Sequence, residues 1–221
     1  MRIGVFDSGK GGLSVLKELK VLLPEVEFIY FADTEHCPYG NKPVEYIIDR
    51  AREITRNLLS EGCECIVVAC NTATAAAIET LRREFDVPFV GIEPAIKPAA
   101  AISKTKVVGV LATANTLKLE KYHRTRDEWG KDVKVIEVPG TGLVEGVEQG
   151  TDATPLLRKY IPMMLEQNAD VIVLGCTHFP FLEEQIRAIA GADVSIINPA
   201  PAVARRVAEV MKLKTETTIT K

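Results

Sequence analysis

Short hydrophobic runs recur along the chain and alternate with longer amphipathic segments. Most of the runs are dense in valine and isoleucine and lack polar alternation, which is typical of parallel strands buried on both faces. They predict strands at Arg2–Phe6, Glu27–Ala32, Cys65–Ala69, Pro88–Ile92, Val107–Leu111, Val133–Val138, Val171–Gly175 and Val194–Ile197. The amphipathic segments predict helices at Leu13–Leu23, Val44–Ser60, Thr72–Phe85, Leu117–Trp129, Pro155–Gln167, Leu182–Ala190 and Ala200–Met211. This alternation predicts an α/β fold with mainly parallel sheets covered by helices.

The chain also contains an internal duplication. IGVFDS near the start has a counterpart in VGVLAT, and IVVACNT has a counterpart in IVLGCTH. The spacing from Gly4 to Cys70 nearly equals that from Gly109 to Cys176, which predicts two similar α/β halves, residues 1–94 and 95–199. We expect the carboxyl ends of both sheets to face a shared cleft. The helix over 200–213 is expected to pack back on the first half, and the polar, Thr-rich tail over 214–221 to be frayed.

Cys70 and Cys176 occupy matching positions in the duplicated unit. Each directly follows a buried strand and precedes a turn into a helix. Unpaired N–H groups and the positive end of the helix dipole favour a thiolate and a bound carboxylate at such a turn. A single free cysteine is often just a small buried hydrophobic residue. Two of them at equivalent positions favour a catalytic pair.

Two loops that follow the first and second strands carry further candidate residues. Asp7-Ser8-Gly9-Lys10-Gly11-Gly12 fits neither the P-loop nor the dinucleotide-binding spacing, so we interpret it as contacting a small anion or an amino acid. Tyr39-Gly40 can supply a hydroxyl and an open backbone N–H group, but a plain Pro/Gly turn fits the bare sequence equally well. His178 stands two residues after Cys176, where an imidazole can share a proton with a thiol.

Metal and cofactor motifs are not found in the sequence. His36 beside Cys37, and the pair Cys63 and Cys65, form neither C-x₂-C nor H-x₃-H spacing, so we predict no metal site. Nothing matches a pyridoxal or nicotinamide signature, and no cofactor is expected. Glu145 taken alone looks like a solvated surface residue.

Composition narrows the class of protein. Hydrophobic residues make up 47% and charged residues 26%, as in an ordinary globular protein, and the formal net charge of -3 does not favour nucleic-acid binding. No apolar run approaches the ~18 to 20 residues of a membrane span, and the start lacks a signal-peptide pattern. The odd count of 5 cysteines favours free thiols. We therefore expect a cytoplasmic protein without a membrane partner.

Several motifs taken together resemble the glutamate racemase family. They are GVFDSGKGGLSV, YFADT with PYGNK, VVACNTATA, GVLAT, LVEG and LGCTHFP, in the family's order from Gly4 to about Pro180. Two features depart from the family pattern: Val138–Gly142 is shortened and lacks the usual Cys-Pro, and Leu119 replaces a serine. These departures concern the wall of the second half rather than the two thiols.

The resemblance implies two halves related by pseudo-twofold symmetry, with glutamate bound between them. It implies that Cys70 and Cys176 are the catalytic thiols, Asp7 a carboxylate beside the first, and His178 an imidazole beside the second with Glu145 as its acidic partner. The implied substrate-contacting residues are Asp7, Ser8, Tyr39, Gly40, Asn71, Thr72, Thr116, Thr177 and His178.

The resemblance further implies a cofactor-independent, cytoplasmic enzyme, often a homodimer, that supplies D-glutamate for peptidoglycan. Each thiol would serve one face of the α-carbon, with Cys70 acting on D-glutamate and Cys176 on L-glutamate. Two alternatives remain open: a two-thiol racemase for aspartate or a related acid, and a non-catalytic protein that binds an acidic ligand or a partner such as DNA gyrase. The motif FDSG-x-GG favours glutamate.

Overall fold

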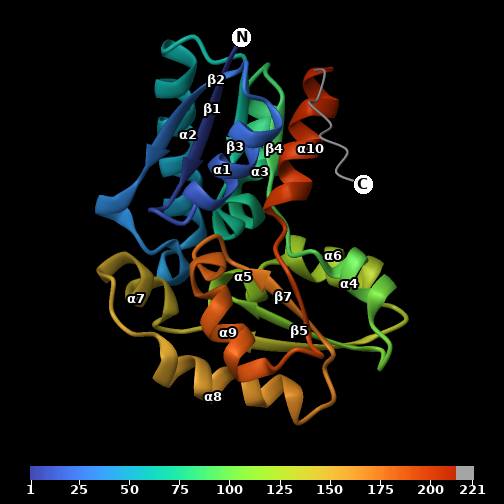
Figure 1. The fold of residues 1–221 in the computed structure, drawn as a ribbon. Helices are drawn as coiled ribbons and strands as arrows, with labels where there is room; N and C mark the ends of the chain where they lie inside the picture. Colours follow the sequence, from blue (N-terminus) through green and yellow to red (C-terminus); the bar gives the residue numbers. More distant parts are fainter. Residues whose placement is uncertain (213–221) are drawn as a thin grey trace.

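The computed structural model describes residues 1–212 as two stacked α/β units (Figure 1). The predicted tail over 214–221, and position 213 of the predicted last helix, lie outside the described residues. Among the described residues, no helix is long and apolar enough to cross a membrane.

The first unit is built on a four-stranded parallel sheet in the order β2-β1-β3-β4. Its strands are β1 (Arg2–Asp7), β2 (Glu27–Ala32), β3 (Cys65–Val68) and β4 (Phe89–Gly91), and its helices are α1 (Leu13–Leu22), α2 (Val44–Ser60) and α3 (Asn71–Glu84). Two 3₁₀ turns, η1 (Thr34–His36) and η2 (Tyr39–Asn41), follow β2. Every residue of β3 is buried, because hydrophobic clusters cover both faces of the sheet.

The second unit repeats this arrangement with the sheet order β6-β5-β7-β8. Its strands are β5 (Val107–Ala112), β6 (Lys134–Pro139), β7 (Val171–Gly175) and β8 (Ser195–Ile197). Its helical segments are α4 (Ile96–Ile102), α5 (Ala114–Lys118), α6 (Glu120–Trp129), α7 (Leu143–Gln149), α8 (Thr154–Leu165), η3 (Phe179–Leu182) and α9 (Glu183–Ala190). The two matching sheet orders confirm the predicted α/β fold with parallel sheets.

The last helix, α10 (Ala200–Met211), returns to the first unit. It packs against α1, and its Val203 and Val207 join the cluster that contains Ile3 and Leu16. Figure 1 shows α10 beside the upper unit, after the chain has left β8 in the lower one. The chain therefore crosses between the units twice, once after β4 and once after β8.

The structure differs from the predicted helices at three places. α4 and α7 were not predicted, and the helix predicted over Leu117–Trp129 is instead divided into α5 and α6 by Leu119, whose ψ of 140° is extended. α7 is short because it begins after Gly142 and ends before Gly150, and both glycines have positive φ angles of 85° and 68°. Hydrophobic periodicity over only seven residues is too brief to reveal such a helix.

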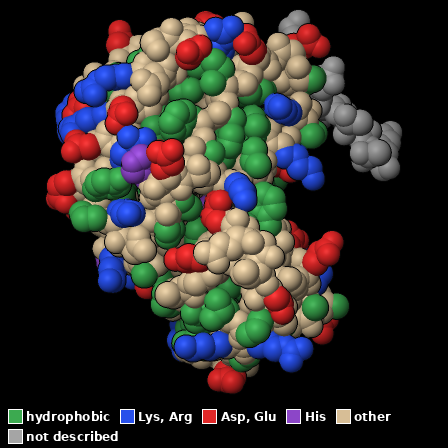
Figure 2. All heavy atoms as spheres, turned by 90° about the vertical axis from the view of Figure 1, so that its left-hand side faces the viewer, with side chains coloured by type: hydrophobic (Ala, Val, Ile, Leu, Met, Phe, Trp, Pro, Cys, Tyr) green, Lys and Arg blue, Asp and Glu red, His purple; other side chains and the backbone are tan. Residues whose placement is uncertain are grey.

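The surface carries acidic and basic side chains close to one another. Figure 2 shows blue and red side chains interspersed with hydrophobic ones, without a broad region of one sign on the face in view. This distribution agrees with the formal net charge of -3 and offers no phosphate-binding stripe on that face.

Candidate active site

The two matched cysteines line one small cavity between the units. Cys70 lies just beyond β3 and Cys176 just beyond β7, so each comes from the carboxyl end of a central strand. Both are almost fully buried, with 5% and 6% exposed, and the space between the units has room for about one water molecule. The cavity is lined by Ser8, Pro38, Tyr39, Gly40, Cys70, Asn71, Thr72, Thr113, Val144, Cys176, Thr177 and His178.

Cys70 is the N-cap residue of α3. Its Sγ accepts a hydrogen bond from the Ala73 N–H at 3.4 Å and lies 3.8 Å from the Ser8 hydroxyl. These donors stabilise a thiolate, as expected for a helix start, but burial has the larger effect and raises the Cys70 pKa to about 12, with the Asp7 charge adding to it. Burial likewise raises the Cys176 pKa well above its usual value. The helix start thus favours the Cys70 thiolate, as expected, while burial between the units opposes it.

Asp7 is a fully buried carboxylate that connects the two units. Its oxygens accept hydrogen bonds from the N–H groups of Gly9 at 3.0 Å and Gly12 at 3.1 Å, and from the Thr177 hydroxyl of the second unit at 3.1 Å. Two N–H groups of the glycine-rich loop are thus bound to the Asp7 carboxylate at the start of the same loop. Burial raises the Asp7 pKa, while the nearby His178 and the hydrogen bonds to Asp7 oppose that shift.

His178 links Cys176 to a carboxylate on α7. Its Nδ1 lies 3.7 Å from the Cys176 Sγ, and its Nε2 lies 2.6 Å from Oε1 of Glu148. The carboxylate beside His178 is therefore Glu148 rather than Glu145, which corrects the partner implied by the family resemblance. The two glutamates are three residues apart and so share one side of α7, one turn from each other, and it is the later one that reaches the imidazole. This spacing within LVEGVE was the signal in the sequence that could have found Glu148.

Glu145 lies at the rim instead. It lines a neighbouring pocket that runs between η2 and the loop before α7, together with Pro38, Gly40, Asn41, Thr113, Ala114, Gly140, Thr141, Gly142 and Val144. This pocket and the thiol cavity share four lining residues, Pro38, Gly40, Thr113 and Val144, so the two spaces lie side by side.

Tyr39 reaches the cavity, but its hydroxyl is already engaged. It donates to Asp33 Oδ2 at 2.5 Å, and the Asp33 carboxylate also binds Arg50 at 2.7 and 3.1 Å and His36 at 2.8 Å. Burial opposes ionisation of Asp33, but these hydrogen bonds lower its pKa overall. The structure thus gives Tyr39 a fixed position, held by Asp33 and Arg50, two residues that the sequence analysis did not single out.

Three threonine hydroxyls form a buried cluster across the cleft. Thr72 Oγ1 lies 2.9 Å from Thr113 and 3.2 Å from Thr116, which are themselves 2.9 Å apart. Thr116 is fully buried behind this cluster and is not among the described residues that line the thiol cavity. Thr113, which was not predicted, lines the cavity in its place.

Asn71 is the polar side chain whose surroundings most clearly indicate a ligand. It is 3% exposed and lines the thiol cavity, yet neither its amide nitrogen nor its amide oxygen has a hydrogen-bond partner in the described structure. Buried amides are almost always paired, because leaving one unpaired costs about 1 to 3 kcal/mol. A bound molecule with both donor and acceptor groups would satisfy both atoms.

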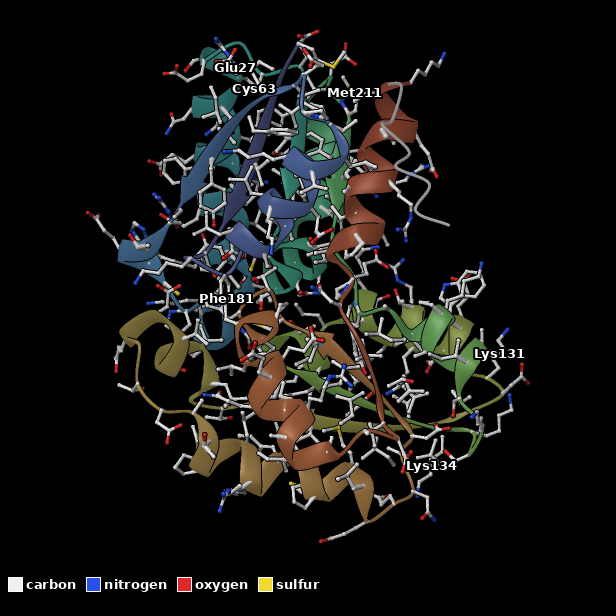
Figure 3. The ribbon with its side chains drawn as sticks, viewed as in Figure 1. Glu27, Cys63, Lys131, Lys134, Phe181 and Met211 are labelled. Carbon is white, nitrogen blue, oxygen red and sulfur yellow. The ribbon has the colours of Figure 1, made fainter. Side chains whose placement is uncertain are left out.

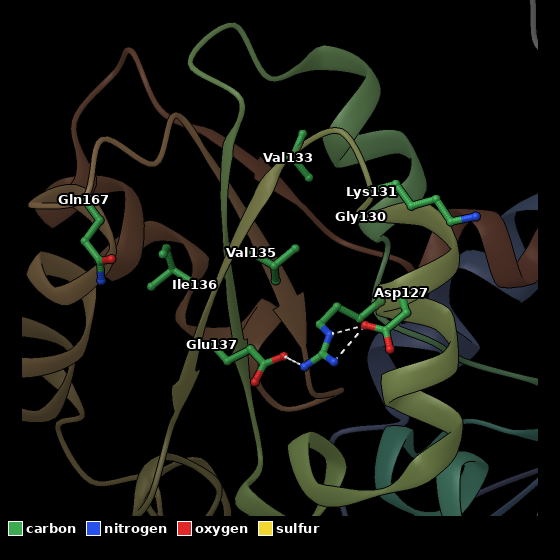
Figure 4. Close-up of a pocket in the computed structure, with 9 residues that line it drawn as sticks. Asp127, Gly130, Lys131, Val133, Val135, Ile136, Glu137 and Gln167 are labelled. Carbon is green, nitrogen blue, oxygen red and sulfur yellow. Dashed lines mark hydrogen bonds and ion pairs between the residues drawn. The ribbon is translucent and has the colours of Figure 1, made fainter.

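Cys63, Cys65 and a hollow in the second unit lie away from this cavity. Cys63, labelled near the top of the first unit in Figure 3, and Cys65 at the start of β3 are at the end of the sheet opposite Cys70. The hollow in Figure 4 lies along the amino-terminal half of β6, where Arg126 pairs with Glu137 at 3.0 Å, and no cysteine or histidine lines it. Neither place combines cysteine thiols with an imidazole, as the cavity between the units does.

Comparison with known proteins gives consistent matches over nearly the whole chain. The family model described as Asp/Glu/hydantoin racemase matches residues 11–207. The glutamate racemase of Ralstonia pickettii strain 12J is 50% identical over 207 residues, covering 92% of this chain and 73% of that protein. The glutamate racemase of Methylococcus capsulatus is 53% identical, covering 92% and 76%.

A solved structure also matches over nearly the whole chain. It is Escherichia coli glutamate racemase in complex with L-glutamate and the activator UDP-MurNAc-Ala, which superposes with a TM-score of 0.89 at 34% identity. The match covers 98% of this chain and 84% of the other.

Proposed function

Because the chain belongs to the Asp/Glu/hydantoin racemase family, we propose that it is a glutamate racemase that interconverts L- and D-glutamate without a cofactor. The observation that carries the proposal is the shared cavity of Cys70 and Cys176, which reach it from equivalent strand ends of two similar units. A two-base racemisation uses one group on each face of the α-carbon, and the two equivalent strand ends supply one thiol each.

The proton transfer involves both thiols in each turnover. The Cys176 thiolate removes the α-proton of L-glutamate, and the Cys70 thiol donates its proton to the opposite face of the planar carbanion. The products are D-glutamate, a Cys176 thiol and a Cys70 thiolate, and the reverse reaction exchanges the two roles. We assign proton exchange with Cys70 to Asp7, whose charge acts on that thiol, and proton exchange with Cys176 to the pair His178 and Glu148, because Nδ1 of His178 lies near the Cys176 Sγ.

The carbanion is stabilised by the environment of the cavity. Ser8, Asn71, Thr72 and Thr177 place amide and hydroxyl groups on its wall, and the free amide of Asn71 suits an amino-acid substrate with donor and acceptor groups. Fixed hydrogen-bond donors in a site closed to water stabilise developing negative charge better than solvent does. Since the cavity has room for only about one water molecule, we expect its walls to open for glutamate to enter.

The physiological setting is proposed from the family resemblance. We expect the protein to act in the cytoplasm as a homodimer, supplying D-glutamate for peptidoglycan, with no nucleic-acid or membrane partner. The mixed surface charge of the face in view supports the absence of a nucleic-acid partner. Light scattering of the purified chain tests the homodimer.

The test of the activity is turnover of the purified full chain. L-glutamate, D-glutamate and L-aspartate are each incubated with protein dialysed against EDTA, and the enantiomers are separated by chiral chromatography. We expect racemisation of glutamate in both directions, loss of it in Cys70→Ser and Cys176→Ser, and its retention in Cys63→Ser, which lies outside the cavity. Preference for aspartate would support the alternative racemase, and ligand binding without turnover would support the non-catalytic alternative.

A further inference from the structure

A third cysteine approaches the residues beside Cys176. The Cys37 Sγ, a carboxylate oxygen of Glu148 and a ring nitrogen of His178 all lie within 4.8 Å of one another. Cys37 comes from the segment after β2, Glu148 from α7 and His178 from the turn after β7, so the two units bring the cluster together. Among the described residues, this is the one group of three or more His, Cys, Asp or Glu side chains close enough to share a metal ion.

The donors match zinc in kind and in charge. A thiolate, an imidazole and a carboxylate are its usual protein ligands, bound at about 2.0 to 2.3 Å. One thiolate and one carboxylate balance the charge of a divalent cation. Three protein ligands leave the fourth tetrahedral position to water.

The local backbone leaves space for these donors. A Cβ atom built on Gly9 would collide with the Glu148 carboxylate and lie 3.1 Å from the Cys37 Sγ, so a larger residue here would displace the ends of both side chains. Donors around a tetrahedral zinc ion lie about 3.5 Å apart, and shifts of about 1 Å would bring the three groups to that spacing. Cys37 and Glu148 are partly exposed while His178 is buried, which gives an ion a route from solvent to the imidazole.

We propose that Cys37, Glu148 and His178 form an inhibitory zinc site at the edge of the active cavity. Zinc would replace the proton shared by His178 and Glu148, which are 2.6 Å apart, and would release that proton and the Cys37 thiol proton to solvent. The imidazole bound to the ion could no longer pass a proton to or from Cys176. The binding itself is independent of the proposed racemase activity, whereas the inhibition rests on it.

The test uses cobalt and zinc ions added to the reduced, EDTA-treated full chain. Cobalt reports a thiolate ligand through its charge-transfer absorption, and zinc competes with it for the site. We expect one cobalt ion per chain in the unmodified protein and in Cys63→Ser, and binding at least about 10-fold weaker in Cys37→Ser. Cys63→Ser is the matched control because it removes a buried thiol away from the cleft.

Activity gives a second readout. Zinc should inhibit racemisation by the unmodified chain and by Cys63→Ser, EDTA should restore it, and Cys37→Ser should need at least about 10-fold more zinc for the same inhibition. Circular dichroism verifies that Cys37→Ser is folded. Equal cobalt affinity of Cys37→Ser and the unmodified chain would overturn the site. Cobalt binding that depends on Cys37 in a chain without racemase activity would refute the proposed function while leaving the site intact.

Discussion

Replacing Glu148 by glutamine tests the assignment of a proton-relay partner to His178. The substitution keeps the size of the side chain but removes its charge, and an amide oxygen cannot stabilise a protonated imidazole as a carboxylate does. Glu145→Gln is the matched control, because Glu145 lies three residues away on the same short helix and lines the neighbouring pocket at the rim.

The magnitude follows from the contacts of the carboxylate. Glu148 Oε1 lies 2.6 Å from His178 Nε2 and accepts the Lys10 N–H at 2.6 Å. Glutamine retains an acceptor for Lys10, so the main loss is one charged hydrogen bond, worth about 1.5 to 3 kcal/mol. At about 1.4 kcal/mol per factor of ten, kcat should fall about 10- to 150-fold in Glu148→Gln. Glu145→Gln should change it by no more than about twofold, as for an ordinary surface substitution.

The assay follows circular dichroism of glutamate from each enantiomer, at saturating and at low substrate. We expect Glu148→Gln to lower kcat more than it changes KM, because a lost transition-state interaction has that pattern. Loss of activity in Glu145→Gln with retention in Glu148→Gln would contradict this assignment and restore Glu145 as the acidic partner of His178.

Three further predictions follow from the cavity and the sheets. Asp7→Asn and His178→Asn should each lower kcat in both directions by about 10² to 10⁴-fold. The α-deuterium isotope effect should grow mainly with D-glutamate as substrate in Asp7→Asn, and mainly with L-glutamate in His178→Asn. Identical isotope effects from both enantiomers would refute the separate roles. Burial raises the Cys70 pKa to about 12, so the fraction of Cys70 present as thiolate grows with pH. We therefore expect kcat/KM for D-glutamate to rise about tenfold per pH unit from about pH 7 to pH 9. A flat pH profile would contradict a Cys70 that is protonated before substrate binds. Gly175→Ala should lower the free energy of unfolding by about 1 to 3 kcal/mol in urea titrations, since the new Cβ would lie 2.8 Å from the Ala112 Cβ and 3.1 Å from a carbonyl oxygen of the paired strand β5. Gly146→Ala, whose Cβ meets nothing closer than 3.5 Å, should show no such loss.

The sequence predicted the sheets better than the short helices. Strands such as β3 and β7 are continuous Val/Ile runs whose burial on both faces leaves little ambiguity, and their matched spacing identified Cys70 and Cys176 as a pair. α7 was missed because two glycines with positive φ angles, rather than a hydrophobic period, define its ends. Glu145 was assigned as the partner of His178 from the family resemblance, and the position of α7 in the structure shows that Glu148 reaches the imidazole.

Other site features depend on contacts between distant segments. Tyr39 was expected to offer a hydroxyl, but that hydroxyl donates to Asp33, which Arg50 holds in place, and no local pattern encodes these bonds. The thiolate-favouring effect of a helix start was a sound local argument. It is outweighed at Cys70 by burial between two units, which only the assembled structure shows.

The central claim is that two thiols serve opposite faces of the substrate, and proton exchange in D₂O tests it most directly. Early in the reaction from L-glutamate, the account predicts that D-glutamate carries deuterium at the α-carbon, because the Cys70 thiol delivers a solvent-derived hydron. The recovered L-glutamate should remain largely protiated, because its proton leaves on Cys176. D-Glutamate that retains the original proton would show one base acting on both faces and would contradict the account.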